Sequence, residues 1–259
     1  KLEDEQIELR HLVSHTSGIK DNWGQMPYAD GDSPYALGAY LEGYLVAGGT
    51  WYDADQNFYA YAPGTGLNYG NIATALAGYM VEVHTEAPFD EFCEDTLFDV
   101  LGMDQTGWHL EDFDPATVAM PYGVQQGVFQ ALGHYGYPDY PDGQLRSSVS
   151  DMASFLAAVS HDGSFQNKRV LAPETVTRMF QPPVPEMSTS QFVFWYEDRW
   201  AERDVVGHNG GDQGVATQMV LAPDTGIGVI VLMNVGWSDP VWTAVDNVMH
   251  TLFEAAEAL

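Results

Sequence analysis

The C-terminal quarter of the chain carries the pattern that most restricts its fold. The segment "VATQMVLA" (215–222) alternates in character, "PDTG" supplies turn-forming residues, and "IGVIVLMN" (227–234) is almost continuously apolar. Two short strand-like runs joined by such a turn predict an antiparallel hairpin of core strands. The preceding "DVVGHNGG" (204–211) has the character of a third strand that ends in glycines. The sequence therefore predicts an antiparallel sheet in this region.

Helical patterns surround the predicted sheet. Apolar residues at 241, 245, 248 and 252 mark a closing amphipathic helix, with Trp242, Met249 and Phe253 widening its apolar face. Earlier helices are expected over 71–83 and 89–101, and Ser148-Val-Ser-Asp151 has capping-box spacing before another short helix. Helices packed on an antiparallel sheet define an α+β fold.

We expect two parts in the chain: a mainly helical lobe over 1–185 and a sheet lobe over 186–259. Between about 122 and 143 the sequence is rich in Gly, Tyr and Pro and has no clear period. This stretch predicts a long ordered aromatic loop, and such loops often form the walls of binding sites.

The charge of the chain excludes several classes of partner. Nine basic residues against 37 acidic ones give a net charge of −28, which disfavours nucleic acids and anionic membranes. The acids are scattered, which favours a solvated surface over a binding site for a cationic partner. No apolar run reaches the roughly 18 residues of a membrane span.

Metal and disulfide chemistry are not expected either. Cys93 is the single cysteine, so the chain forms no internal disulfide. His11 and His15 have the i, i+4 spacing of a helical metal pair, but the Glu of a zinc protease motif and an obvious third ligand are missing. Packing is the favoured role for both histidines, and we predict neither a metal nor a cofactor.

Two short stretches carry candidate chemistry. Tyr69 stands at the entry of a predicted helix, where the positive end of the helix dipole would favour its phenolate and let it act as a general base. Asn71 beside it can both donate and accept hydrogen bonds. His208 stands at a strand end before glycines, and the N–H of Gly211 could face a developing oxyanion. Taken alone, a structural tyrosine and a tight turn explain each stretch as well.

Together and in this order, several phrases resemble the serine β-lactamase and penicillin-binding-protein-like hydrolases, specifically the class C and esterase branch. The resemblance covers essentially the whole chain. The phrases that carry it are "LRHLVSHTSGI", "YAPGTGLNYGNIATALAGYMVE", "FDVLGMDQTGW", "DGQLRSSVSDMASFL", "RVLAPETVTRMF" and "GHNGGDQGVATQMVLAPDTGIGVIVLMN".

The resemblance decides how to interpret Ser17 and Lys20, which have the Ser-x-x-Lys spacing of a nucleophile and its base. In that family this phrase follows the nucleophile helix, and Gly18 directly after Ser17 suits a turn. The pair is therefore expected to be a decoy. No other Ser-x-x-Lys occurs in the 259 residues. The expected nucleophile lies upstream, on a segment that also supplies an N-terminal helix and two strands absent from this chain.

The resemblance implies an acyl-enzyme mechanism without a cofactor. The upstream serine would attack a carbonyl, Tyr69 would relay the proton, Asn71 would orient the lysine, and the N–H of Gly211 would complete the oxyanion hole. His208 takes the place of the lysine in a Lys-Thr-Gly motif, and a mostly neutral imidazole favours neutral esters, amides or D-amino-acid peptides over penicillins.

Substrate contacts are expected from four further residues. Asn209 and Gly210 follow His208 on the same strand, and Tyr135 and Tyr137 are predicted to form an acyl-pocket wall, with simple packing as the alternative. The partner is then a small-molecule or peptide substrate. A second class stays open, a catalytically inactive protein that binds a peptide or cell-wall fragment. The resemblance alone suggests a periplasmic or secreted location.

Overall fold

The computed structural model describes residues 6–259 and confirms the predicted antiparallel sheet. Four strands lie in the order β10-β9-β8-β7, and every neighbouring pair is antiparallel. Their bounds are β7 Tyr196–Trp200, β8 Arg203–Asp212, β9 Val215–Ala222 and β10 Ile227–Met233. Ala201 and Glu202 between β7 and β8 both have positive φ, which matches the twist of a two-residue hairpin turn.

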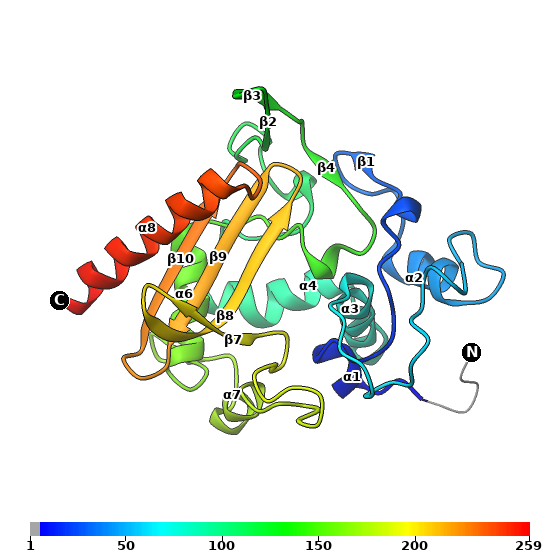
Figure 1. Cartoon of the computed structure of the whole chain (residues 1–259), viewed down its shortest axis with the longest axis horizontal. Coiled ribbons are helices and arrows are strands. Elements are labelled where there is room, and N and C mark those ends of the chain that lie inside the picture. The colour runs from blue at the N-terminus through cyan, green and yellow to red at the C-terminus, as the bar shows by residue number, and fades with distance from the viewer. Residues whose placement is uncertain (1–5) are drawn as a thin grey trace.

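Alternation along the strands gives the sheet two apolar faces. On β8, Val205 belongs to the cluster under helix α8 (Asp239–Glu257), whereas its neighbour Val206 belongs to a cluster with Leu156 of helix α6 (Val149–Ser160). The sheet therefore lies between α8 on one face and α6 on the other, as Figure 1 shows. This is the α+β layer arrangement that the sequence predicts.

The predicted internal helices are also present. Asn71 begins α3 (Asn71–Thr85), and Ser148 caps α6 by accepting the N–H of Asp151 at 3.1 Å. The helix expected over 89–101 is continuous but contains a π turn, and Gly102 ends it at a φ of 71°. The helices not yet given bounds are α1 Leu9–Val13, α2 Leu37–Leu45, α4 Phe89–Cys93, η2 Glu94–Phe98 (the π turn), α5 Asp99–Leu101 and α7 Pro173–Met179.

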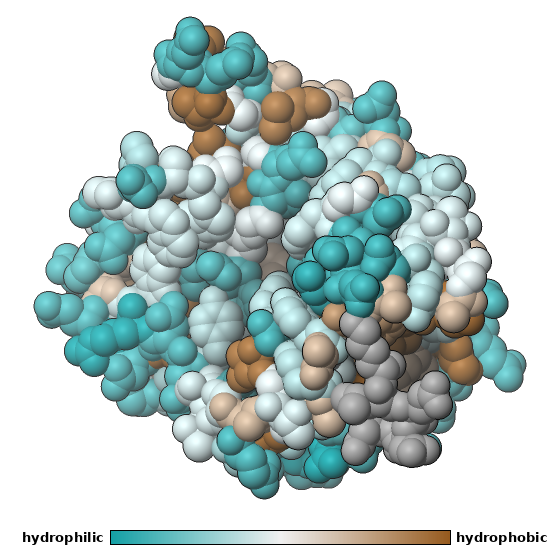
Figure 2. All heavy atoms as spheres, turned by 45° about the vertical axis from the view of Figure 1, so that its right-hand side comes forward, coloured by the Kyte–Doolittle hydropathy of each residue, from teal (hydrophilic) through white to brown (hydrophobic). Residues whose placement is uncertain are grey.

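The segment over 122–143 is not the long loop that the sequence predicts. It contains a hairpin of β2 (Tyr122–Gln125) and β3 (Val128–Ala131), because Gln126 and Gly127 both take positive φ and close a two-residue turn. The hairpin projects at the top of Figure 1, and apolar side chains gather at the top of Figure 2. Its exposed apolar residues are Val124, Val128 and Phe129.

Short elements complete the chain. β4 (Tyr135–Gly136) pairs with β1 (Ala29–Asp30), and β5 (Ser164–Phe165) pairs with β6 (Lys168–Arg169). The one-turn 3-10 helices are η1 Trp23–Gln25, η3 Leu110–Asp112 and η4 Tyr140–Asp142. Through η4 the aromatic segment contacts α3, which fixes it beside the helix that Tyr69 precedes.

The closing helix buries a narrower stripe than expected. Val245, Met249 and Phe253 are fully buried under the sheet, whereas Val248 and Leu252 remain exposed. Rows of residues four apart form the contact ridge of such a helix. Within residues 6–259, no helix has the length and apolar character needed to cross a membrane. The division of the chain into two lobes at residue 185 stays a prediction. So do the N-terminal helix and the two strands expected on the upstream segment.

Candidate active site

The rings of Tyr69 and His208, two of the candidate residues from sequence, lie close together. Their ring centroids lie 5.8 Å apart with the planes tilted by 42°. Tyr69 directly precedes the first cap residue of α3, and His208 lies on β8, so one ring comes from the helical part and the other from the sheet. The view in Figure 2 shows a hollow in the middle of a mostly hydrophilic face.

The two rings belong to a longer chain of aromatic contacts. His15 stacks on Tyr69 with centroids 4.3 Å apart, and Phe194 lies 6.1 Å beyond His15. On the other side, the ring of Tyr196 lies 5.2 Å from that of His208. Five rings from four separate segments therefore form one contiguous row.

The start of α3 is held by a carboxylate that sequence analysis did not identify. Asp21 accepts the backbone N–H groups of Asn71 and Ile72 at 2.9 to 3.1 Å and the side-chain amide of Asn71 at 2.8 Å. These contacts fix Asn71, which lies two residues after Tyr69 in the chain. They also place a negative charge at the positive end of the helix dipole.

The pKa of Tyr69 moves in the direction opposite to that expected from sequence. Burial, Asp142 and Asp21 together raise the pKa of the phenol to about 12. The expectation of a lowered pKa for Tyr69 is therefore wrong. Asp21 already offsets the positive end of the helix dipole, and carboxyl groups near the phenol disfavour a further negative charge. Lys20 offers no compensation, since its ammonium group lies over the ring of Tyr59 at 5.9 Å.

A coupled pair of aspartates, Asp139 and Asp142, lies near this site. Asp139 is fully buried. Its carboxyl group meets that of Asp142, and burial raises the pKa of both, with the pair repulsion adding to the shift of Asp142. At most one of the two carries a charge near neutral pH.

The end of β8 presents a neutral imidazole and two glycines. The Nδ1–H of His208 donates to the carbonyl oxygen of Asn209, and burial lowers the pKa of the imidazole. The side-chain oxygen of Asn209 accepts the hydroxyl of Tyr196 at 3.1 Å. Nε2 of His208 is therefore an acceptor without a hydrogen-bond partner among residues 6–259, and Asn209 is fixed by the neighbouring strand.

Close neighbours require glycine at both positions after Asn209. A Cβ atom on Gly210 would lie 2.2 Å from the Thr217 hydroxyl, and one on Gly211 would lie 2.8 Å from Cδ1 of Trp237. The Trp237 indole also donates to the carbonyl of Gly210 at 2.6 Å. These contacts bring other groups close to the backbone of Gly210 and Gly211.

One edge of β8 is open along this stretch. β7 pairs with β8 only as far as Gly207, so 208–212 pair with β9 alone in the described part of the chain. Gly211 is exposed there. The location suits the predicted oxyanion donor, and that role stays a prediction.

The two predicted wall tyrosines lie at different depths. Tyr135 is half-buried and donates its hydroxyl to the carbonyl of Gln213 in the β8–β9 turn at 2.9 Å. Tyr137 is 8% exposed and packs edge-on against Tyr28 with centroids 5.8 Å apart. Both tyrosines lie near Asp212 at the end of β8, and their contact with substrate stays a prediction.

Ser17 and Lys20 are indeed a decoy by geometry. Ser17 lies outside any helix, is 4% exposed, and accepts the N–H of Ile19 on its hydroxyl at 3.2 Å. Gly18 follows with a φ of 80°. The two side chains therefore do not share the helical turn that a Ser-x-x-Lys pair needs.

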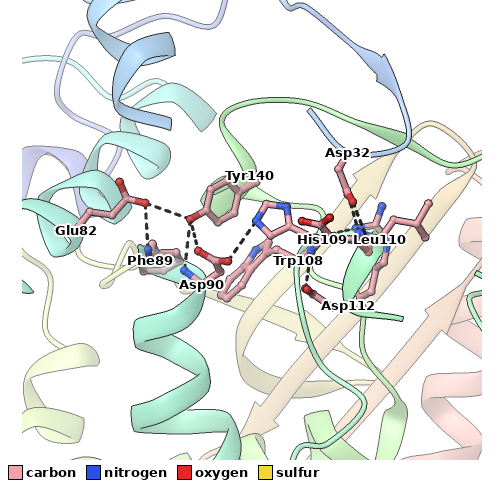
Figure 3. A network of polar contacts seen from close by, with 11 residues as sticks. Asp32, Glu82, Phe89, Asp90, Trp108, His109, Leu110, Asp112 and Tyr140 are labelled. Atoms are coloured by element: carbon pink, nitrogen blue, oxygen red, sulfur yellow. Dashed lines mark hydrogen bonds and ion pairs between the residues drawn. The ribbon is translucent and has the colours of Figure 1, made fainter. Parts of the chain in front are cut away.

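A second group of titratable side chains lies at the other end of α3 and is shown in Figure 3. The hydroxyl of Tyr140 contacts Glu82 at 3.2 Å and Asp90 at 3.0 Å, and His109 pairs with Asp90 at 3.3 Å. A cavity of about 570 Å³ opens beside them. All four groups have partners, so this network joins α3, α4, η3 and η4 as a structural contact.

The sequence indicated the surroundings of the site only in part. His11 and His15 each accept a backbone N–H on Nδ1, from Glu8 and Gly70 respectively. No group of three or more His, Cys, Asp or Glu side chains in residues 6–259 is arranged to hold a metal ion. Asp21 and Trp237 meet the site from distant segments, and no local pattern signals them. Asp142 stood in the stretch predicted as a site wall.

The fold and this site define a mixed α+β hydrolase-like protein, and the chain belongs to the Beta-lactamase family, whose model matches residues 2–243. The D-amino acid amidase from Ochrobactrum anthropi SV3, in complex with L-phenylalanine amide, shares its fold with a TM-score of 0.73 at 20% identity. That match covers 99% of this chain and 75% of the amidase. A penicillin-binding protein from Bacillus halodurans has a TM-score of 0.68 at 20% identity, over 100% of this chain and 76% of its own.

Curated relatives are more distant in length. Penicillin-binding protein 4 of Amycolatopsis lactamdurans is 24% identical over 92% of this chain and 62% of its own length. Unguisins hydrolase ungD' of Aspergillus campestris is 24% identical over 68% of this chain and 34% of its own length. The chain thus spans about three fifths of the length of the first relative and about a third of the length of the second.

Proposed function

We propose that this chain is the larger part of a serine hydrolase that cleaves esters, amides or D-amino-acid peptides through an acyl-enzyme. The observation that carries the proposal is the approach of the Tyr69 phenol to the His208 imidazole beside the glycine-lined end of β8. A nucleophilic serine on a Ser-x-x-Lys segment outside these 259 residues completes the site.

Each predicted residue then has one task. The serine hydroxyl adds to the substrate carbonyl, and its proton passes through Tyr69 to the leaving group as the carbon–nitrogen or carbon–oxygen bond breaks. The N–H of Gly211 stabilises the negative oxygen of the tetrahedral intermediate. Asn71, held by Asp21, orients the lysine, and water then releases the acyl group from the serine.

The raised pKa of Tyr69 defines what the lysine must supply. With Asp142 and Asp21 nearby, the phenol holds its proton at neutral pH, which makes it a weak base by itself. An ammonium group beside the phenol offsets those carboxylates and lowers its pKa. The pair of lysine and Tyr69 is therefore the general base, rather than either group alone.

The charges around the site favour neutral or amine-bearing substrates. Asp21 and Asp212 lie near the rings that border it, the coupled pair of Asp139 and Asp142 adds at most one negative charge, and His208 is a neutral imidazole. A carboxylate substrate such as a penicillin would meet repulsion there, and the net charge of −28 adds a long-range barrier. The amidase from O. anthropi, bound to an amino acid amide, is consistent with this substrate class.

The test uses the protein expressed with its Ser-x-x-Lys segment. A fluorophosphonate probe should label it covalently, and D-phenylalanine amide or p-nitrophenyl butyrate should be turned over faster than nitrocefin. Faster hydrolysis of nitrocefin would contradict the substrate preference. Failure of the probe to label the folded protein would contradict catalysis and favour the alternative, a binding protein without turnover.

A further inference from the structure

His15 contacts three consecutive residues around the predicted proton carrier. Its carbonyl oxygen accepts the N–H of Asn68 at 2.9 Å, its Nδ1 accepts the N–H of Gly70 at 3.4 Å, and its ring stacks on Tyr69. The stacked rings have centroids 4.3 Å apart and planes tilted by 35°. One residue therefore binds the backbone on both sides of Tyr69 and one face of its ring.

The neighbourhood of Tyr69 explains why such a contact matters. Tyr69 precedes α3, so no helical hydrogen bond of its own fixes it, and the residue is 50% exposed. A half-exposed tyrosine loses rotamer freedom only where neighbours restrict it. The His15 ring lies 4.3 Å from the ring of Tyr69, and the ring of His208 lies 5.8 Å from it.

His15 itself is held firmly. It is 3% exposed, it takes a left-handed backbone conformation with a φ of 56°, and its ring packs between Tyr69 and Phe194. Phe194 in turn donates its N–H to the carbonyl of Val13 at 2.9 Å. A non-glycine residue in this conformation costs free energy, and such strain is retained mainly at functional positions.

From this geometry we propose that His15 is a positioning residue that fixes the Tyr69 phenol toward His208, and that it acts as the neutral tautomer protonated on Nε2. The proposal rests on the serine hydrolase function proposed above. The tautomer follows from the Gly70 contact, because Nδ1 must be unprotonated to accept an N–H.

The surroundings of His15 keep it neutral. Burial and the nearby His208 lower the pKa of its imidazole to about 4. A second proton would place two N–H groups against each other at Gly70 and would cost the contact. His15 therefore does not transfer protons near neutral pH, and its contribution is geometric.

Two substitutions separate the parts of the contact. His15→Asn keeps an acceptor for Gly70 and a side chain that tolerates positive φ, but it removes the ring. His15→Phe keeps a ring and removes the acceptor. His11→Asn is the matched control, because His11 is similarly buried and accepts the Glu8 N–H through Nδ1, but it makes no ring contact with Tyr69.

We expect both His15 variants to lower kcat by about ten- to a hundredfold, since small displacements of a catalytic group have effects of this size. KM should stay within about threefold, because His15 is not expected to touch the substrate. His15→Asn should keep a thermal midpoint near that of the wild type and still lose kcat. His11→Asn should change the midpoint without lowering kcat. A kcat within twofold of the wild type in both His15 variants would overturn the proposal.

A second measurement needs no activity. Nitrogen-15 NMR of the imidazole groups, with His15→Asn identifying the His15 signals, should show the neutral Nε2–H tautomer at pH 6. A cationic His15 or the Nδ1–H tautomer at that pH would overturn the proposal whatever the kcat values of the variants. A wild-type protein that the fluorophosphonate does not label would instead contradict the proposed function, while the NMR result still judges His15.

Discussion

Each end of α3 lies beside titratable side chains that include tyrosine and histidine. The two groups differ in how completely their polar atoms are paired. At the N-terminal end, Tyr69 meets His15 and His208 mainly through ring contacts, and Nε2 of His15 has no hydrogen-bond partner in the described residues. At the C-terminal end, Tyr140 and His109 bond to carboxylates that have further partners. The same residue types are thus weakly satisfied at one end and fully satisfied at the other.

The difference separates a site for chemistry from a structural contact. At the C-terminal end, His109 and Asp90 shift each other's pKa toward the charged forms, which stabilises an ion pair. At the N-terminal end, burial shifts the pKa of Tyr69, His15 and His208 toward the neutral forms, and like charges add to the shifts of Tyr69 and His15. Titratable groups whose pKa is shifted toward the neutral form are candidates for catalysis, because a charge introduced beside them changes that pKa strongly.

Tyr69→Phe should give the largest effect. It removes the hydroxyl that we propose carries the proton and keeps the ring that stacks on His15. We expect kcat for p-nitrophenyl butyrate to fall about 10²- to 10⁴-fold, the range for a lost acid–base group. Tyr140→Phe, at the other end of α3, is the matched control and should lower stability with little loss of kcat. A Tyr69→Phe enzyme with wild-type kcat would remove the distinction between the two ends.

Gly211→Ala should give the next largest effect. The added Cβ would lie 2.8 Å from Cδ1 of Trp237, so either the indole or the backbone that presents the predicted oxyanion donor must shift. Loss of one such donor lowers kcat by about 10²- to 10³-fold, and we expect a change near the lower end. Gly24→Ala is the control, because its Cβ would make an ordinary 3.6 Å contact with Asn22. Equal activities of the two variants would argue against an oxyanion role for Gly211.

His109→Gln should change stability and leave catalysis intact. The raised pKa of His109 stabilises the fold below about pH 6.5, and this contribution is lost as the pH rises through the folded value. The lowered pKa of Asp90 acts above about pH 3.8 and is lost as the pH falls through its folded value. The ion pair is therefore strongest between these limits.

The measurement is the thermal midpoint of wild type and His109→Gln across pH. We expect a loss of about 2 °C near pH 5.5, since a partly exposed pair contributes up to about 1 kcal/mol, and a smaller loss near pH 8.5. A loss that grows toward high pH would contradict the ion pair.

Cys93 should give the smallest response. Burial raises the pKa of its thiol to about 12, so almost no thiolate exists near pH 8. Iodoacetamide should alkylate the folded protein slowly and the urea-unfolded protein completely, as followed by intact mass. Rapid alkylation of the folded protein would contradict a buried, protonated Cys93 thiol near the C-terminal end of α3.

Sequence patterns predicted the elements well where one period dominates. Alternation over 215–222 and the turn at 223–226 predicted the sheet, and the roles of Tyr69 and His208 followed from the family resemblance. The pKa direction of Tyr69 could not be predicted, because Asp21 and Asp142 approach it from about 50 and 70 residues away. The β2–β3 hairpin was missed because a Gln-Gly turn is a weaker signal than Asn-Gly.

The most direct test of the account is a crystal structure of the fluorophosphonate adduct of the protein with its Ser-x-x-Lys segment. We expect phosphorus on that serine, a phosphoryl oxygen accepting the N–H of Gly211, and the Tyr69 hydroxyl within hydrogen-bond reach of the serine oxygen. An adduct bound away from both Tyr69 and His208 would contradict it.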